Sequence, residues 1–208
     1  MKKLILFDVD GTLVDSYPYF AKIMEQLLPQ FGIEPTERRM KRAFTMTAKQ
    51  EVKYFKVPAD RTEEWYTTYA AIARKTELQP EAYPEIDAMF EHLLSQPGVK
   101  IGIVTSRSRD DANENLQSFW WYQKMAIVVT SSDTKQPKPA GEPLEFACEK
   151  LGFSANETFY IGDADTDEQA ALNADVDFGG ALWGTGSKKN FKSEPLLLDS
   201  PEDVNRII

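Results

Sequence analysis

KLILFDVDGTLVDS, residues 3–16, is the stretch of sequence that decides the fold. Its first part, Lys3 to Phe7, is a short apolar run that ends abruptly at Asp8. An apolar run that stops at polar residues in this way is typical of a parallel strand buried on both faces and followed by a polar loop. Asp8 and Asp10 stand two residues apart, so in extended chain their side chains point the same way. The stretch therefore predicts a buried strand that presents carboxylates at its end.

Further strands and helices alternate in the second half of the chain. The apolar runs that resemble the first strand are KIGIVT (100–105), AIVVT (126–130), TFYI (158–161) and FGGAL (178–182). Between them lie helical patterns: Ile86, Met89, Phe90, Leu93 and Leu94 are spaced for one helix face, Ser108 can cap a helix, and the helix that ends at Leu151 is followed by Gly152. Strands that alternate with helices indicate a doubly wound, Rossmann-like α/β fold with a parallel sheet.

Residues 15–82 interrupt this alternation, because they contain helical patterns and no convincing strand. Ser16 and Thr36 can each cap a helix, and Asp60 with Glu63 resembles a capping box for a third. The first of these helices carries apolar residues on one face: Phe20, Ile23, Met24, Leu27 and Leu28. We therefore expect an α/β core made of residues 1–14 and 83–208, with an inserted α-helical cap domain over residues 15–82.

Charge and composition restrict the class of partner. The chain has 208 residues, with 24 Lys+Arg and 33 Asp+Glu, a formal net charge of −9. Residues 15–82 carry 11 Lys+Arg and 10 Asp+Glu, so the acidity belongs to the core. A chain this acidic is unsuited to a nucleic acid backbone, and no apolar run approaches the roughly 18 residues that span a bilayer. We expect a cytoplasmic protein, a monomer or weak homodimer, without a nucleic acid or membrane partner.

Acidic residues gather where the predicted strands end. Asp8 and Asp10 follow the first strand, and Asp163 and Asp167 follow the strand over residues 158–161. In an open α/β sheet, ligands bind beyond the carboxyl ends of the strands. Four carboxylates at one edge repel one another unless a cation neutralises them. Oxygen donors without a neighbouring His or Cys select Mg²⁺ over Zn²⁺, so the sequence predicts a magnesium site.

These residues carry a family resemblance. Asp8-x-Asp10-Gly11-Thr12, Thr105 at a strand end, Lys138 before a proline, and Gly162-Asp163-x-x-x-Asp167 occur in the order and spacing of the haloacid dehalogenase superfamily. The chain is most similar to the branch that contains phosphoglycolate phosphatase-like and β-phosphoglucomutase-like enzymes, in which a helical cap follows the first motif. The resemblance covers nearly the whole sequence and includes the later stretch Trp183 to Ser187.

The resemblance implies a role for each matching residue. Asp8 would be the nucleophile that forms an aspartyl-phosphate, and Asp10 the general acid and base. Thr105, Gly11 and the Ser106 backbone N–H would bind the phosphoryl group, with Lys138 balancing its charge. Mg²⁺ would be held by Asp8, by the backbone carbonyl of Asp10 and by Asp163, with Asp167 close by or acting through water. The implied function is a magnesium-dependent phosphatase, a phosphoric monoester hydrolase acting on a small phosphorylated metabolite.

Two other functions use the same residues. A phosphomutase of the β-phosphoglucomutase type shares these motifs, and a sensor of phosphorylated compounds could retain the site without catalysis. Dehalogenation is disfavoured, because Asp10 supplies a proton that a departing halide does not need. Ser106-Arg107 stands where Asn-Lys is frequent, which weakens an assignment to phosphoglycolate specifically.

The segment Thr45 to Lys49 is the candidate specificity loop of the cap. We expect Thr47 and Lys49 to bind the substrate, although the neighbouring cations Arg38, Arg39, Lys41 and Arg42 are also typical of a solvated helix face.

Overall fold

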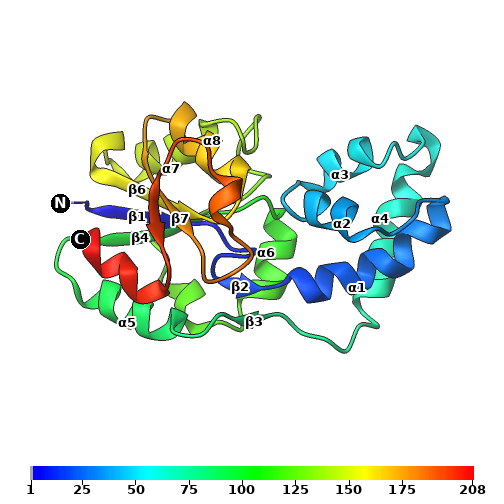
Figure 1. Ribbon diagram of the computed structural model, residues 1–208, viewed down its shortest axis with the longest axis horizontal. Helices are drawn as coiled ribbons and strands as arrows, with labels where there is room; N and C mark the ends of the chain where they lie inside the picture. Colours follow the sequence, from blue (N-terminus) through cyan, green and yellow to red (C-terminus); the bar gives the residue numbers. More distant parts are fainter. Residues whose placement is uncertain (1) are drawn as a thin grey trace. The chain divides into compact units, whose positions relative to one another are not determined.

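The chain forms two compact units. A computed structural model describes residues 2–208 (Figure 1). One unit comprises Met1–Val14 with Ala82–Ile208, and the other is Asp15–Glu81. The sequence predicts that the core resumes at residue 83, whereas in the structure it resumes at Ala82, one residue earlier. In residues 2–208, no helix combines the length and the apolar character needed to cross a lipid bilayer.

A six-stranded parallel sheet organises the first unit, in the strand order β5-β4-β1-β6-β7-β8. These strands are β1 (Leu4–Phe7), β4 (Lys100–Val104), β5 (Ile127–Val129), β6 (Thr158–Gly162), β7 (Asp177–Ala181) and β8 (Leu196–Leu198). Phe7, the last residue of β1, pairs in register with Ile103 of β4 and Ile161 of β6. The carboxyl ends of these three strands therefore lie side by side, and the predicted doubly wound α/β class is confirmed.

Helices cover both faces of this sheet (Figure 1). They are α5 (Ile86–Ser95) and α6 (Arg109–Leu116) on one face, and α7 (Glu142–Leu151) and α8 (Asp165–Asn173) on the other. Along β1, Ile5 and Phe7 pack in the first core, while Leu4 and Leu6 pack in the second. Strand β1 is apolar at every position because successive side chains enter opposite cores. Short 3₁₀ turns complete the unit: η3 (Trp120–Lys124), η4 (Ala155–Glu157), η5 (Lys188–Asn190) and η6 (Pro201–Arg206).

The second unit is helical and has a core of its own. It contains α1 (Tyr17–Leu27), η1 (Leu28–Phe31), α2 (Glu37–Phe44), α3 (Ala48–Tyr54), η2 (Ala59–Arg61) and α4 (Thr62–Ala73). The apolar face predicted for the first helix is buried, and it packs in one cluster with Met40, Phe55 and Trp65. Where the chain leaves and re-enters the core, β2 (Val14–Asp15) pairs with β3 (Glu81–Ala82) as a separate two-stranded sheet.

Some local predictions were wrong. Asp60 does not cap a helix, because Ala59–Arg61 forms a 3₁₀ turn and α4 begins only at Thr62. Leu94 is 41% exposed and lies outside the apolar stripe of α5. The edge strand β8 was missed because its three leucines are too few to show a strand period.

The two adjacent leucines of α5 provide a matched test of this packing. Leu93 is fully buried in the core cluster that contains Phe7 and Phe90, whereas Leu94 is exposed. Leu93→Ala should lower the free energy of unfolding by about 2–5 kcal/mol through lost burial and a residual cavity. Leu94→Ala, which makes the same change of helix propensity, should stay within about 0.5 kcal/mol of the wild type. Urea denaturation followed by circular dichroism measures both, and equal losses would contradict this placement of the helix.

Candidate active site

The loop after β1 places Asp8 and Asp10 by turning sharply. The N–H groups of Thr12, Leu13 and Val14 all donate to the carbonyl of Val9. Gly11 adopts a φ of +87°, and a Cβ there would collide with the Asp163 carboxylate and the Thr185 hydroxyl. Only glycine therefore allows the loop to lie against the end of β6.

Three of the four predicted acidic residues form one buried cluster. Asp8, Asp163 and Asp167 each offer a carboxylate oxygen, and these oxygens lie within 4.8 Å of one another. All three side chains are buried, with Asp167 only 1% exposed. Burial raises the pKa of Asp8 well above its ordinary value, against the opposing effect of Lys138. Burial, followed by the charge of Asp167, raises the pKa of Asp163 to about 7. The cluster is therefore short of positive charge.

Lys138 is the cation within this cluster. Its Nζ donates to Oδ1 of Asp8 and to Oδ1 of Asp167, both at 2.6 Å, and to the Tyr160 hydroxyl at 2.9 Å. Burial by itself would lower the pKa of Lys138, but Asp167 and Asp8 raise it above its ordinary value. Lys138 is therefore held as an ammonium ion that joins the end of β1 to the first turn of α8.

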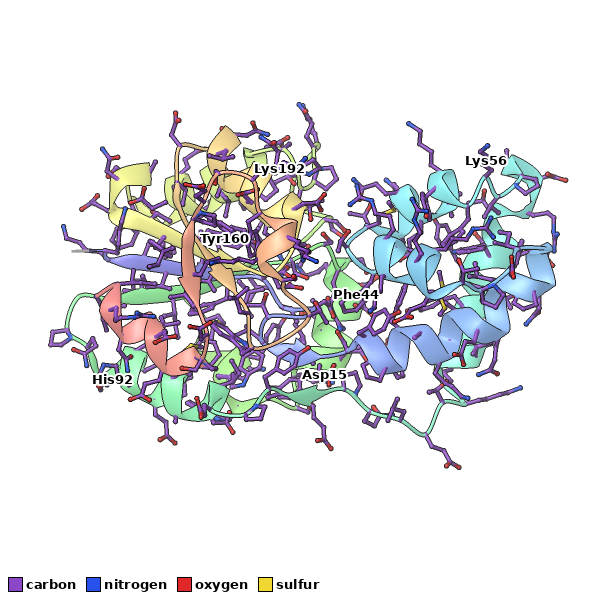
Figure 2. All side chains as sticks on the ribbon, in the orientation of Figure 1. Asp15, Phe44, Lys56, His92, Tyr160 and Lys192 are labelled. Atoms are coloured by element: carbon purple, nitrogen blue, oxygen red, sulfur yellow. The ribbon has the colours of Figure 1, made fainter. Side chains whose placement is uncertain are left out.

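Tyr160 is a site residue that the sequence analysis missed. It lies on β6 (Figure 2). Its hydroxyl is 2.9 Å from Oδ1 of Asp167 and 3.2 Å from the carbonyl of Val104. Burial and the nearby charges of Asp167 and Asp8 raise its pKa well above the ordinary value, so the hydroxyl keeps its proton. A tyrosine within an otherwise apolar buried strand requires a polar partner, and this signal was available in TFYI.

Hydroxyl groups orient the Asp163 carboxylate. Thr12 Oγ1 donates to Oδ1 at 3.0 Å, and the Thr185 hydroxyl donates to Oδ2. Thr185 belongs to the glycine-rich stretch after β7, and its N–H donates to the carbonyl of Gly11. Trp183 Nε1 donates to the carbonyl of Thr12 at 2.7 Å. This stretch thus braces the loop that carries Asp10.

Asp10 lies outside the acidic cluster. Its two carboxylate oxygens accept hydrogen bonds from Arg107, at 2.9 Å from Nε and 2.7 Å from Nη2. Arg107 follows Thr105 and Ser106 at the end of β4, and its N–H donates to Thr105 Oγ1 at 3.2 Å. The structure therefore brings the predicted residues of the β4 end beside those of the β1 end, but it pairs the Asp10 side chain with a guanidinium.

The remaining predicted residues lie in the helical unit. Thr47 is buried and caps α3: its hydroxyl accepts the N–H of Gln50, and its own N–H donates to the Gln50 side chain. Lys49 is exposed in the first turn of the same helix. Their binding of a substrate stays a prediction.

The donor set suits a hard divalent cation. Carboxylate oxygens are the ligands such ions prefer, and a dication would offset the charge that raises the pKa of Asp163. Asp167 already accepts from Lys138 and Tyr160 on Oδ1 and from the Ala164 N–H on Oδ2. Asp163 accepts two hydrogen bonds and Asp8 accepts one from Lys138, so these two carboxylates keep more lone pairs for an ion than Asp167 does. Asp8 and Asp163 would therefore hold the ion, with Asp167 beside it.

A parallel α/β core with a buried lysine and an acidic cluster at its strand ends is the architecture of a class of hydrolases. Within this class, the chain belongs to the haloacid dehalogenase-like hydrolases, because the model of that family matches residues 5–181.

Individual relatives are similar over most of their length. A pyrophosphatase PpaX from Bacillus velezensis is 30% identical over 86% of this chain and 82% of its own. A phosphoglycolate phosphatase from Psychrobacter arcticus is 30% identical over 88% of this chain and 84% of its own. The crystal structure of a Lactobacillus plantarum protein matches all of both chains with a TM-score of 0.88 at 29% identity. The chain is accordingly an enzyme of the phosphatase class.

Cation binding at the cluster is testable without an activity assay. Mg²⁺ at a hundredfold excess over its dissociation constant should stabilise the protein by about 2.7 kcal/mol, roughly a 5–10 °C rise in Tm. Asp163→Asn removes one carboxylate of the cluster and should abolish most of this shift, as followed by differential scanning calorimetry with Mg²⁺ and with EDTA. Asp165→Asn is the matched control, because Asp165 is the first residue of α8 and lies outside the cluster. An undiminished shift in Asp163→Asn would place the ion elsewhere.

Proposed function

We propose that this chain is a magnesium-dependent phosphatase that hydrolyses a small phosphorylated metabolite in the cytoplasm through an aspartyl-phosphate on Asp8. The observation that carries the proposal is the buried contact of Asp8 with Lys138 beside Asp163 and Asp167. A nucleophilic carboxylate, a fixed ammonium ion and a cation-binding pair are what phosphoryl transfer needs, since its transition state demands positioning and charge neutralisation.

The first half of the reaction moves the phosphoryl group to the enzyme. A bond forms between an Asp8 oxygen and phosphorus while the bond from phosphorus to the leaving oxygen breaks, and Asp10 gives its proton to that oxygen. Lys138 donates to Oδ1 of Asp8 at 2.6 Å, so Oδ2 is the oxygen that we propose attacks phosphorus.

The second half returns the enzyme to its starting state. Water attacks phosphorus and gives a proton to Asp10, the bond to Asp8 breaks, and inorganic phosphate leaves. Lys138, Thr105 and the Ser106 N–H are the groups proposed to hold the phosphoryl oxygens throughout. A bound magnesium ion would supply charge stabilisation to the same oxygens.

Two features support phosphate compounds as the substrate class. Asp10 is present to protonate a leaving oxygen, and relatives similar to this chain are named for the hydrolysis of phosphoglycolate and pyrophosphate. A phosphomutase would use the same residues but return the phosphoryl group to a sugar. Analysis of the products from a hexose 1-phosphate distinguishes the two reactions.

Hydrolysis of p-nitrophenyl phosphate tests the mechanism. The wild type should release nitrophenolate with Mg²⁺ and stop with EDTA. Asp8→Asn should lose at least about a thousandfold in kcat, since its amide cannot form the covalent intermediate. Asp165→Asn controls for the loss of one acidic charge nearby and should remain active. Activity that survives Asp8→Asn would rule out the covalent route, and a broad panel of phosphorylated metabolites without any phosphate release would overturn the function.

Substrate choice by the helical unit is tested on Thr47 and Lys49. Lys49→Ala should change the ratio of kcat/KM between phosphoglycolate, pyrophosphate and sugar phosphates, because an exposed ammonium can contact an anionic substrate group. Thr47→Ala removes the cap of α3 and should also cost about 1 kcal/mol of stability, so Thr47→Ser, which keeps a capping hydroxyl, is the proper comparison. Identical ratios in Lys49→Ala and in the wild type would exclude Lys49 as a specificity residue.

A further inference from the structure

Arg107 and Asp10 form a two-pronged ion pair at the edge of the site. Nε and Nη2 of the guanidinium each donate to a different oxygen of the carboxylate, at 2.9 and 2.7 Å. The side chains are only 12% and 19% exposed, so solvent weakens the pair little. Two parallel hydrogen bonds between planar groups fix the plane of the carboxylate as well as its position.

The guanidinium is itself held on its far side. Nη1 donates to Oδ2 of Asp111 at 3.1 Å, and Oδ1 of Asp111 accepts from Asn115 at 2.9 Å. Asp111 and Asn115 both belong to α6, and Ser108 caps that helix by accepting the Asp111 N–H. Arg107 thus connects the capped first turn of α6 to Asp10, which lies on a loop.

The charges around Arg107 argue against a role in binding anions. Asp10 and Asp111 together carry more negative charge than the one guanidinium offsets. An anionic substrate group would have to displace one of these carboxylates to reach Arg107. Positioning is the role that the contacts favour.

We propose that Arg107 is a positioning residue that holds the Asp10 carboxylate in the orientation needed for proton transfer at the leaving oxygen, an inference that rests on the proposed phosphatase function. Each carboxylate oxygen has two lone-pair sites, and the Arg107 fork uses one on each. The remaining sites are fixed in direction, and a proton donor contributes only when it lies within hydrogen-bond reach of the leaving oxygen. Arg107 therefore acts on the step that breaks the bond to the leaving group.

Two aryl phosphates that differ only by a para nitro group test this role. Phenyl phosphate has a more basic leaving oxygen than p-nitrophenyl phosphate and needs the proton of Asp10 more. Arg107→Gln should lower kcat/KM for phenyl phosphate by about 10- to 100-fold, and for p-nitrophenyl phosphate by less than about threefold, with KM nearly unchanged. Arg107→Lys keeps the charge but cannot span both oxygens, so it should recover only part of the loss.

Arg109→Gln is the matched control. Arg109 lies two residues further along and pairs with Asp133, away from Asp10, so its loss should not discriminate between the two substrates. Thermal melts of each variant show whether the fold is retained. Equal losses on both substrates in Arg107→Gln, or a loss confined to KM, would overturn the positioning role while leaving the phosphatase function intact. A wild type inactive on both substrates with Mg²⁺ would overturn the function itself, and the inference with it.

Discussion

The site depends on the burial of three carboxylates within 4.8 Å of one another. Burial and mutual repulsion both disfavour their ionised forms, so the surrounding structure must supply positive charge and hydrogen-bond donors. Lys138 supplies the charge by contacting Asp8 and Asp167, and Thr12 and Thr185 supply donors to Asp163. This compensation is incomplete, since the pKa of Asp163 is still raised to about 7. A cation bound at the cluster, as proposed, would offset the remaining repulsion.

The sheet order makes this cluster possible. Because β1 lies between β4 and β6 in register, Asp8, Thr105 and Asp163 follow neighbouring strands at one edge. Glycines then permit the close approach of the loops. A Cβ at Gly184 would strike the carbonyl of Gly11, so the stretch after β7 can brace the first loop only with glycine at both positions. The hydrogen bonds of Trp183 and Thr185 follow from that contact.

Sequence order predicts which residues meet at the strand ends better than it predicts the hydrogen bonds that join them. The order of the strands and the acidic residues after them was sufficient to place Asp8, Asp163 and Lys138 at one edge. The partner of Asp10 was not predictable, because Arg107 is 97 residues away and its side chain has several carboxylates within the same region to choose from. The role of Thr47 as the N-cap of α3 was predictable from the sequence, since Gln50 follows three residues later as in a capping box. Edge strand β8 could not be predicted from the sequence, because these residues form a strand through pairing with β7 and not through a local sequence pattern.

Asp8 and Asp10 stand two residues apart, yet the structure gives them different counter-charges. Asp8 is buried against a lysine, a single point of charge that donates to Oδ1. Asp10 is partly exposed and meets an arginine, whose planar fork engages both oxygens and fixes their plane. Two carboxylates in different environments can serve different roles in one reaction. In the proposed reaction, the lysine would favour attack by Asp8 and the arginine would favour directed proton transfer by Asp10. The choice of cation would thus divide the proposed chemistry between two otherwise identical side chains.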